Sequence, residues 1–197
     1  AQPRTAEAVS VKVPAIWRGK LDKGIEIIGT HSDEIPAVSI MIALPGGIRA
    51  EGKGELGLAS LTAAMLGQGT ARLSEAELSD ELQKLGASIS VSTAQYNNLI
   101  TISSLTDKLP QTLALVREVL LQPGLREADF ERLKAQTLQG MKQSEQQPEW
   151  LAGQAFRELV YGKQNRLGQP TDGVLTDVER LTLADVKRFY HAYYNST

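Results

Sequence analysis

The stretch Gly57-Leu-Ala-Ser-Leu-Thr-Ala-Ala-Met-Leu-Gly-Gln-Gly-Thr70 is where the periodicity of this chain changes from that of strands to that of a helix. Apolar residues recur at helical spacing from Leu58 to Leu66, because side chains three and four positions apart share one face of a helix. Gly67 and Gly69 then break the pattern. The stretch therefore predicts a buried helix.

The residues before this helix alternate as strands do. Residues 24–29 alternate well enough for a half-buried strand, and residues 37–44 form a β-branched run that ends at Pro45-Gly-Gly47. We expect these two strands to be adjacent and joined around residues 31–36. The polar opening, residues 1–9, has no periodicity and predicts a linker or loose terminus.

The residues after the helix predict a second helix, a hairpin and then more helices. Ser74 and Glu77 form a capping box, which starts a helix over residues 75–85. Two alternating segments, 87–93 and 99–105, predict the hairpin, and Thr182 with Asp185 opens the last helix. The other predicted helices cover 109–121, about 130–146 and 150–160.

This order of elements predicts an α+β fold. Strand, strand, helix, helix, hairpin and helices do not alternate as a βαβ chain does, so a mainly antiparallel sheet with helices layered on one face is favoured. The 197 residues are 42% hydrophobic and 22% charged, which suits one globular core. We therefore expect a single domain over residues 10–197.

Composition excludes several classes of function. A formal net charge of −2 without blocks of like charge does not favour a nucleic-acid partner. The chain has no cysteine, which removes disulfides, thiolate metal sites and cysteine nucleophiles. No run approaches the roughly 20 apolar residues of a membrane helix, so we expect no membrane span.

Residues that could carry chemistry are few and scattered. The two histidines, His31 and His191, have no second histidine at i+4 and no nearby ligand cluster. Zinc needs three or four convergent ligands, so we expect no metal site in this chain. Ser60 lacks the strained turn that presents a serine nucleophile, and it is expected to be a packed helix serine.

The order of several segments resembles one homology domain of the pitrilysin/insulinase zinc metallopeptidases, the family that includes mitochondrial processing peptidase. The family's Gly-x-Arg-x-Glu stretch is matched by Gly47-Ile-Arg-Ala-Glu51, and residues 57–70 match its zinc helix without the His-x-x-Glu-His residues. The resemblance places the two family histidines at Ser60 and Ala64 and the general-base glutamate at Ala63. It places the third zinc ligand near Gly140, anchored on Pro148.

The resemblance implies a non-catalytic domain of a longer, multi-domain chain. Such a domain would shape a peptide-binding chamber and assist a separate domain, in the same chain or in a partner subunit, that carries the zinc; the parent protein would be a zinc metalloendopeptidase. A purely architectural subunit is the first alternative, and an enzyme with unrelated chemistry on the same fold is the second. The family and the lack of cysteine suggest an exported, periplasmic bacterial protein.

Overall fold

The computed structural model of the chain describes residues 14–32 and 34–194. The contacts within the chain divide it into two compact units, with the boundary between Pro36 and Ala37. The linker predicted for residues 1–9 lies outside the described residues, and the single domain over residues 10–197 stays a prediction.

The first unit is a short antiparallel hairpin of β1 (Ile16–Lys20) and β2 (Glu26–Thr30), with the 3₁₀ turn η1 (Asp22–Gly24) between them. Trp17 pairs with Gly29 across the hairpin. A Cβ atom at Gly29 would lie 2.3 Å from Cζ2 of the indole, so any larger residue there would require the tryptophan ring to move.

The second unit contains a three-stranded antiparallel sheet in the order β3 (Ala37–Pro45), β5 (Asn97–Leu105) and β4 (Ser88–Thr93). The two strands expected at 24–29 and 37–44 form as β2 and β3, joined through residues 31–36, but each has its own partner: β2 pairs with β1 and β3 pairs with β5. Alternation indicates that a segment is a strand, but it does not identify the partner. Here β3 and β5 match in length along nine paired positions.

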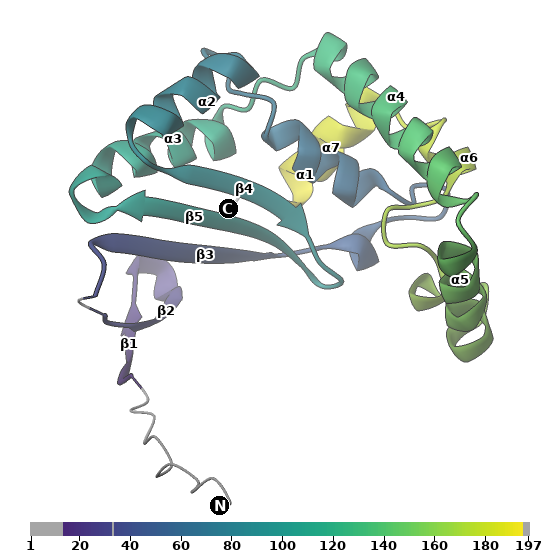
Figure 1. The fold of residues 1–197 in the computed structure, drawn as a ribbon, viewed down its shortest axis with the longest axis horizontal. Helices are drawn as coiled ribbons and strands as arrows, with labels where there is room; N and C mark the ends of the chain where they lie inside the picture. Colours follow the sequence, from purple (N-terminus) through teal and green to yellow (C-terminus); the bar gives the residue numbers. More distant parts are fainter. Residues whose placement is uncertain (1–13, 33, 195–197) are drawn as a thin grey trace, which may run out of the picture. The chain divides into compact units, whose positions relative to one another are not determined.

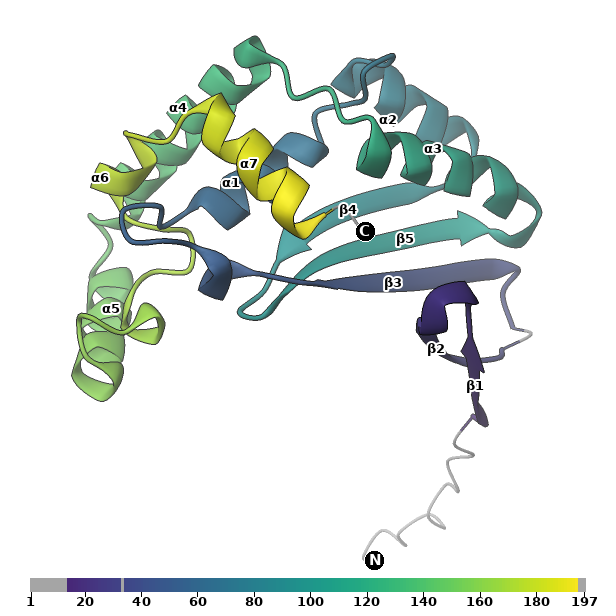
Figure 2. The same ribbon diagram turned by 180° about the vertical axis from the view of Figure 1, so that it is seen from behind.

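Helices cover one face of this sheet, as Figures 1 and 2 show from opposite sides. α2 (Glu75–Lys84) packs on β4 and α3 (Leu109–Leu121) on β5, while α1 (Leu58–Leu66) contacts β4, α7 (Leu183–Tyr193) and α4 (Glu127–Ser144). The predicted α+β fold is confirmed. The remaining elements are α5 (Pro148–Tyr161), α6 (Leu175–Val178) and the 3₁₀ turns η2 (Ile48–Ala50), η3 (Thr106–Lys108) and η4 (Arg166–Gly168).

The largest core cluster surrounds α1. Seven of the nine residues of this helix are buried, which confirms the expected buried helix. The fully buried Phe130 from α4 and Val186 from α7 belong to the same cluster. A separate cluster between the sheet and α3 contains Ile100 and Ile102 of β5 and Val116 of α3. α1 is thus fixed on several sides, which positions the residues described next.

Candidate functional site

The four positions that the family resemblance singles out lie on two helices that pack together. Ser60, Ala63 and Ala64 are on α1, and Gly140 is on α4. Ser60 is half-buried, Ala63 is buried and Ala64 is exposed. Gly140 is exposed, and a Cβ atom built there would meet no other atom within 4 Å. The helical frame is therefore present, with open space at two of the four positions.

These four residues do not fit a zinc ion. A hydroxyl, two methyl groups and a glycine supply none of the imidazole, thiolate or carboxylate ligands that zinc takes in proteins. Among residues 14–32 and 34–194, no group of three histidine, cysteine, aspartate or glutamate side chains is placed to hold a metal ion. The two histidines lie in different units, His31 after β2 and His191 in the last turn of α7. The match of these four positions to the family's zinc ligands and base stays a prediction.

Restoring three ligands tests that match. The variant Ser60→His/Ala64→His/Gly140→Glu is expected to retain about one zinc ion per chain after dialysis, because residues at i and i+4 share one helical face and α4 packs beside it. Ala63 stays unchanged, because a carboxylate at this buried position would lose its hydration. The control Ser60→His/Ala64→His supplies only two ligands. Equal zinc contents in the two variants would contradict the match.

The start of α1 is held by a carboxylate that comes from outside the helix. Gly57 precedes the helix and offers no side chain to cap it. The Oε1 atom of Glu51 accepts hydrogen bonds from the backbone N–H groups of Gly57 and Ala59, both at 3.0 Å. These are among the N–H groups that a helix leaves without internal partners, and a negative charge is favourable at this end of the helix dipole. Glu51 therefore acts as the missing cap.

The other oxygen of Glu51 forms an ion pair with the largely enclosed guanidinium of Arg166. Arg166 donates from Nη2 to Oε2 of Glu51 at 2.8 Å and from Nε at 3.0 Å, and the glutamate side chain is fully buried. Burial raises the pKa of Glu51 above its ordinary value, and the hydrogen bonds from Ala59 and Arg166 oppose that rise. Arg166 also donates to the carbonyl oxygens of Pro170 and Thr171, at 2.8 and 3.2 Å.

The Glu51–Arg166 pair gives a structural role to a motif identified in the sequence. Gly47-Ile-Arg-Ala-Glu51 carried the family resemblance, and its glutamate ties the start of α1 to the 166–171 segment. Arg166 was not predicted. It is a single arginine at the start of the short 3₁₀ turn η4, and no local sequence pattern distinguishes it from the other basic residues of the chain.

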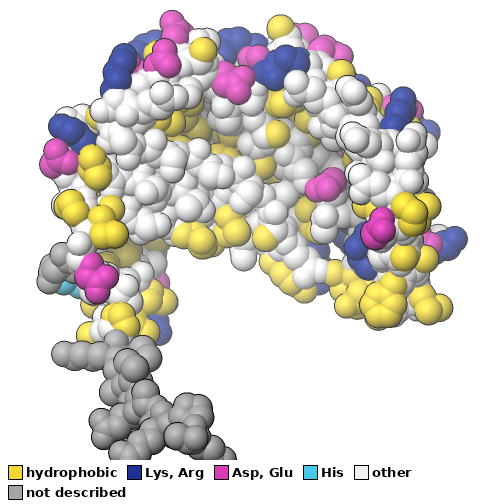
Figure 3. Space-filling model, viewed as in Figure 1, with side chains coloured by type: hydrophobic (Ala, Val, Ile, Leu, Met, Phe, Trp, Pro, Cys, Tyr) yellow, Lys and Arg dark blue, Asp and Glu magenta, His cyan; other side chains and the backbone are white. Residues whose placement is uncertain are grey.

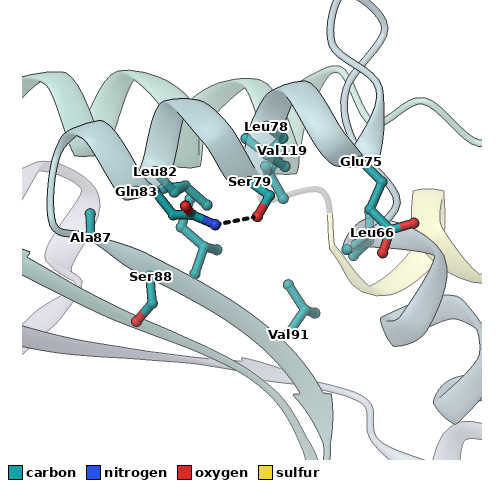
Figure 4. A pocket seen from close by; sticks show the side chains of 12 residues that line it. Leu66, Glu75, Leu78, Ser79, Leu82, Gln83, Ala87, Ser88, Val91 and Val119 are labelled. Atoms are coloured by element: carbon teal, nitrogen blue, oxygen red, sulfur yellow. Dashed lines mark hydrogen bonds between the residues drawn. The ribbon is translucent and has the colours of Figure 1, made fainter.

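An apolar groove of about 290 Å³ runs between α2 and β4 (Figure 4). Leu78 and Leu82 of α2 point from above toward Val91 of β4, and Leu66 closes one end. Ser79 and Gln83 lie on the α2 side, with the Gln83 amide donating to the Ser79 hydroxyl at 3.4 Å. Glu75 and Ser88 also line it, so the groove combines a mainly apolar lining with four polar side chains, as small binding sites commonly do. Sequence patterns did not indicate it.

The same groove follows a free edge of the sheet. Among the described strands, β4 pairs only with β5. The bond from the Ala94 N–H to the Asn97 carbonyl fixes the alternation of this hairpin, so the backbone N–H and C=O groups of Ile89 and Val91 point away from β5. An edge of this kind is able to pair with another extended chain.

The chain matches proteins of one family along most of its length. The profile of the family Insulinase (Peptidase family M16) matches residues 27–171. In Helicobacter pylori, "non-peptidase homolog YmxG" is 24% identical over 83% of this chain and 38% of its own length. In Saccharomyces cerevisiae, the mitochondrial-processing peptidase subunit beta is 20% identical over 94% of this chain and 40% of its own length.

A solved structure shows the same architecture. The crystal structure of a "peptidase M16 inactive domain" from Pseudomonas fluorescens superposes with a TM-score of 0.82 at 25% identity, covering 89% of this chain and 43% of its own. The chain thus spans about two fifths of the length of the curated relatives it matches. Within the described residues, none of the helices combines the length and the hydropathy needed to cross a membrane.

Proposed function

Because the chain belongs to the insulinase family, Peptidase M16, we propose that it is a non-catalytic domain that shapes a peptide-binding chamber and assists a separate zinc-bearing domain in proteolysis. One observation carries the proposal. α1 forms as a buried helix packed beside α4, and Ser60, Ala64 and Gly140, which the family resemblance assigns to the zinc ligands, carry no side chain that binds zinc. A domain that keeps the frame without the ligands contributes through its surfaces.

The groove between α2 and β4 is the surface that best supports contact with a peptide. An extended peptide beside β4 would exchange main-chain hydrogen bonds with Ile89 and Val91, and these bonds do not depend on peptide sequence. Alternate side chains of the peptide would point into the apolar groove. This arrangement suits a protein that holds unfolded chains of varied sequence.

The open face of the sheet supports the same role. Its side chains are uncharged and mostly small, so it would repel neither acidic nor basic peptides. The helices lie on the opposite face of the sheet (Figure 1). These residues are Ala37, Ser39, Met41, Ala43 and Pro45 of β3, Ser88, Ser90 and Ser92 of β4, and Asn97, Leu99, Thr101, Ser103 and Leu105 of β5.

The test is reconstitution with a zinc-loaded Peptidase M16 domain that carries His-x-x-Glu-His, taken from the same organism. Hydrolysis of a fluorogenic peptide is expected to rise when this chain is added. Val91→Pro removes an N–H that points away from β5, and we expect it to lower kcat/KM of the mixture by roughly three- to tenfold, the value of one hydrogen bond.

Val91→Thr is the matched control, because it has a similar shape and retains the N–H. It is expected to leave the mixture close to wild type, and thermal unfolding of both variants shows whether either has lost its fold. Equal activity of the two variants would show that the Val91 N–H does not bind the peptide. If the rate of hydrolysis does not change when the wild-type chain is added, the chain does not assist proteolysis.

A purely architectural role is the alternative, and one observation favours it. The Helicobacter pylori relative is named a non-peptidase homolog. An architectural domain would bind the zinc-bearing domain without changing its rate of hydrolysis. The same mixture therefore separates the two functions when binding and hydrolysis are both measured.

A further inference from the structure

α5 presents an unbroken apolar stripe to solvent. The stripe consists of Leu151, Ala152, Ala155, Phe156, Leu159 and Val160. These positions share one side of a helix, and all six are exposed. Leu159 is 85% exposed and Phe156 is 65% exposed, which is unusual for side chains of this size. In Figures 1 and 2, α5 stands at the end of the second unit, away from its sheet.

The side of α5 that faces the rest of the unit is polar. Gln154 is the one buried residue within this helix, and its amide donates to the carbonyl oxygen of Gly168 at 2.8 Å. Arg157 donates to the amide oxygen of Gln154 at 2.9 Å. The helix packs on η4 through these groups. Its pattern is therefore the reverse of an ordinary surface helix, which buries its apolar side.

The exposure of this stripe favours a partner. Contiguous apolar surface on a soluble protein marks an interaction site more often than isolated exposed residues do. Figure 3 shows hydrophobic side chains gathered over α5. A 14-residue helix is marginally stable in water without tertiary packing of an apolar face. A partner that covers the stripe would supply that packing.

We propose that the stripe is the docking surface for a second domain of the Peptidase M16 type. The matched relatives are more than twice the length covered by this chain, so proteins of this kind contain further chain of comparable size. The stripe is the convex side of a helix and carries no charge. A convex helix surface packs against another helix or sheet of a folded domain, whereas a peptide needs a groove or a strand edge.

This inference rests on the proposed function and names the surface through which the partner would be bound. Leu159→Glu tests it, because it places a charge in the stripe while glutamate remains a good helix former. Leu121→Glu is the matched control, since Leu121 is an exposed leucine at the end of α3. Both variants are expected to unfold at the wild-type temperature.

Affinity for the zinc-loaded domain that carries His-x-x-Glu-His is measured by sedimentation or calorimetry. Leu159→Glu is expected to weaken binding at least tenfold, and Leu121→Glu is expected to leave it unchanged. If the partner binds wild type and Leu159→Glu equally, the docking surface is wrong and the proposed function still stands. If the chain instead dimerises through the stripe, a second copy is the occupant and the inference is overturned. If no association occurs, both proposals fail.

Discussion

Replacing Glu51 with alanine is expected to lower the free energy of unfolding by about 3–5 kcal/mol, the range for removing one partner of a buried ion pair. The carboxylate is fully buried and accepts hydrogen bonds from two backbone N–H groups at the start of α1. Its loss leaves those donors unpaired and leaves Arg166 with its charge almost enclosed by protein. Chemical denaturation at pH 7 measures the change.

Two further variants test whether the decrease in the free energy of unfolding comes from the burial and pairing of Glu51. Glu81 makes an exposed ion pair with Lys84 at 2.7 Å, so Glu81→Ala is expected to cost less than about 1 kcal/mol. Glu51→Ala/Arg166→Met removes both charges of the buried pair, and it is expected to cost less than the sum of the two single changes. Strict additivity of the single changes would show that the pair does not act as a unit.

Gly173→Ala is expected to cost about 2–5 kcal/mol, because two separate penalties combine at this position. The residue has a φ of +96°, a region that residues with a Cβ atom rarely adopt. A Cβ atom would also lie 2.2 Å from the carbonyl oxygen of Leu56 and 2.6 Å from Cα of Gly57. These are backbone atoms at the start of α1, so they are unable to rotate away.

Gly54→Ala is the matched control for this change. Gly54 has a φ of +83°, and a Cβ atom there would meet nothing within 4 Å. Only the conformational penalty applies, which is about 1–2 kcal/mol. If denaturation curves give the same decrease in the free energy of unfolding for both variants, the close approach of residue 173 to the start of α1 adds no steric penalty.

Local signals predicted the helices of this chain well. The capping boxes Ser74–Glu77 and Thr182–Asp185 both form, and α2 and α7 begin where these signals placed them. Each signal lies within four residues, so the surrounding fold has little effect on it. Pro148, which lies between the helices predicted at about 130–146 and 150–160, stands at the first position of α5, where a proline is well tolerated.

Contacts between distant residues could not be predicted from pattern. β3 pairs with β5 across more than fifty residues of chain, and nothing within β3 indicates that partner. The same applies to Arg166, whose partner Glu51 is 115 residues earlier. The sequence predicted the α5 helix, but it did not predict that the apolar side of this helix faces solvent. That orientation depends on the contact between Gln154 and Gly168. The family resemblance placed Ser60 and Ala64 on one helix, which α1 confirms.

The separation of 115 positions between Glu51 and Arg166 also affects how this chain folds during synthesis. A ribosome delivers the chain from its N-terminus, so α1 and its glutamate emerge long before the arginine that neutralises it. Until then, closing the core around α1 would enclose an unpaired carboxylate, which is strongly unfavourable. We therefore expect the second unit to complete its folding only after residues 166–173 have emerged, and contacts between residues so far apart in sequence favour slow folding.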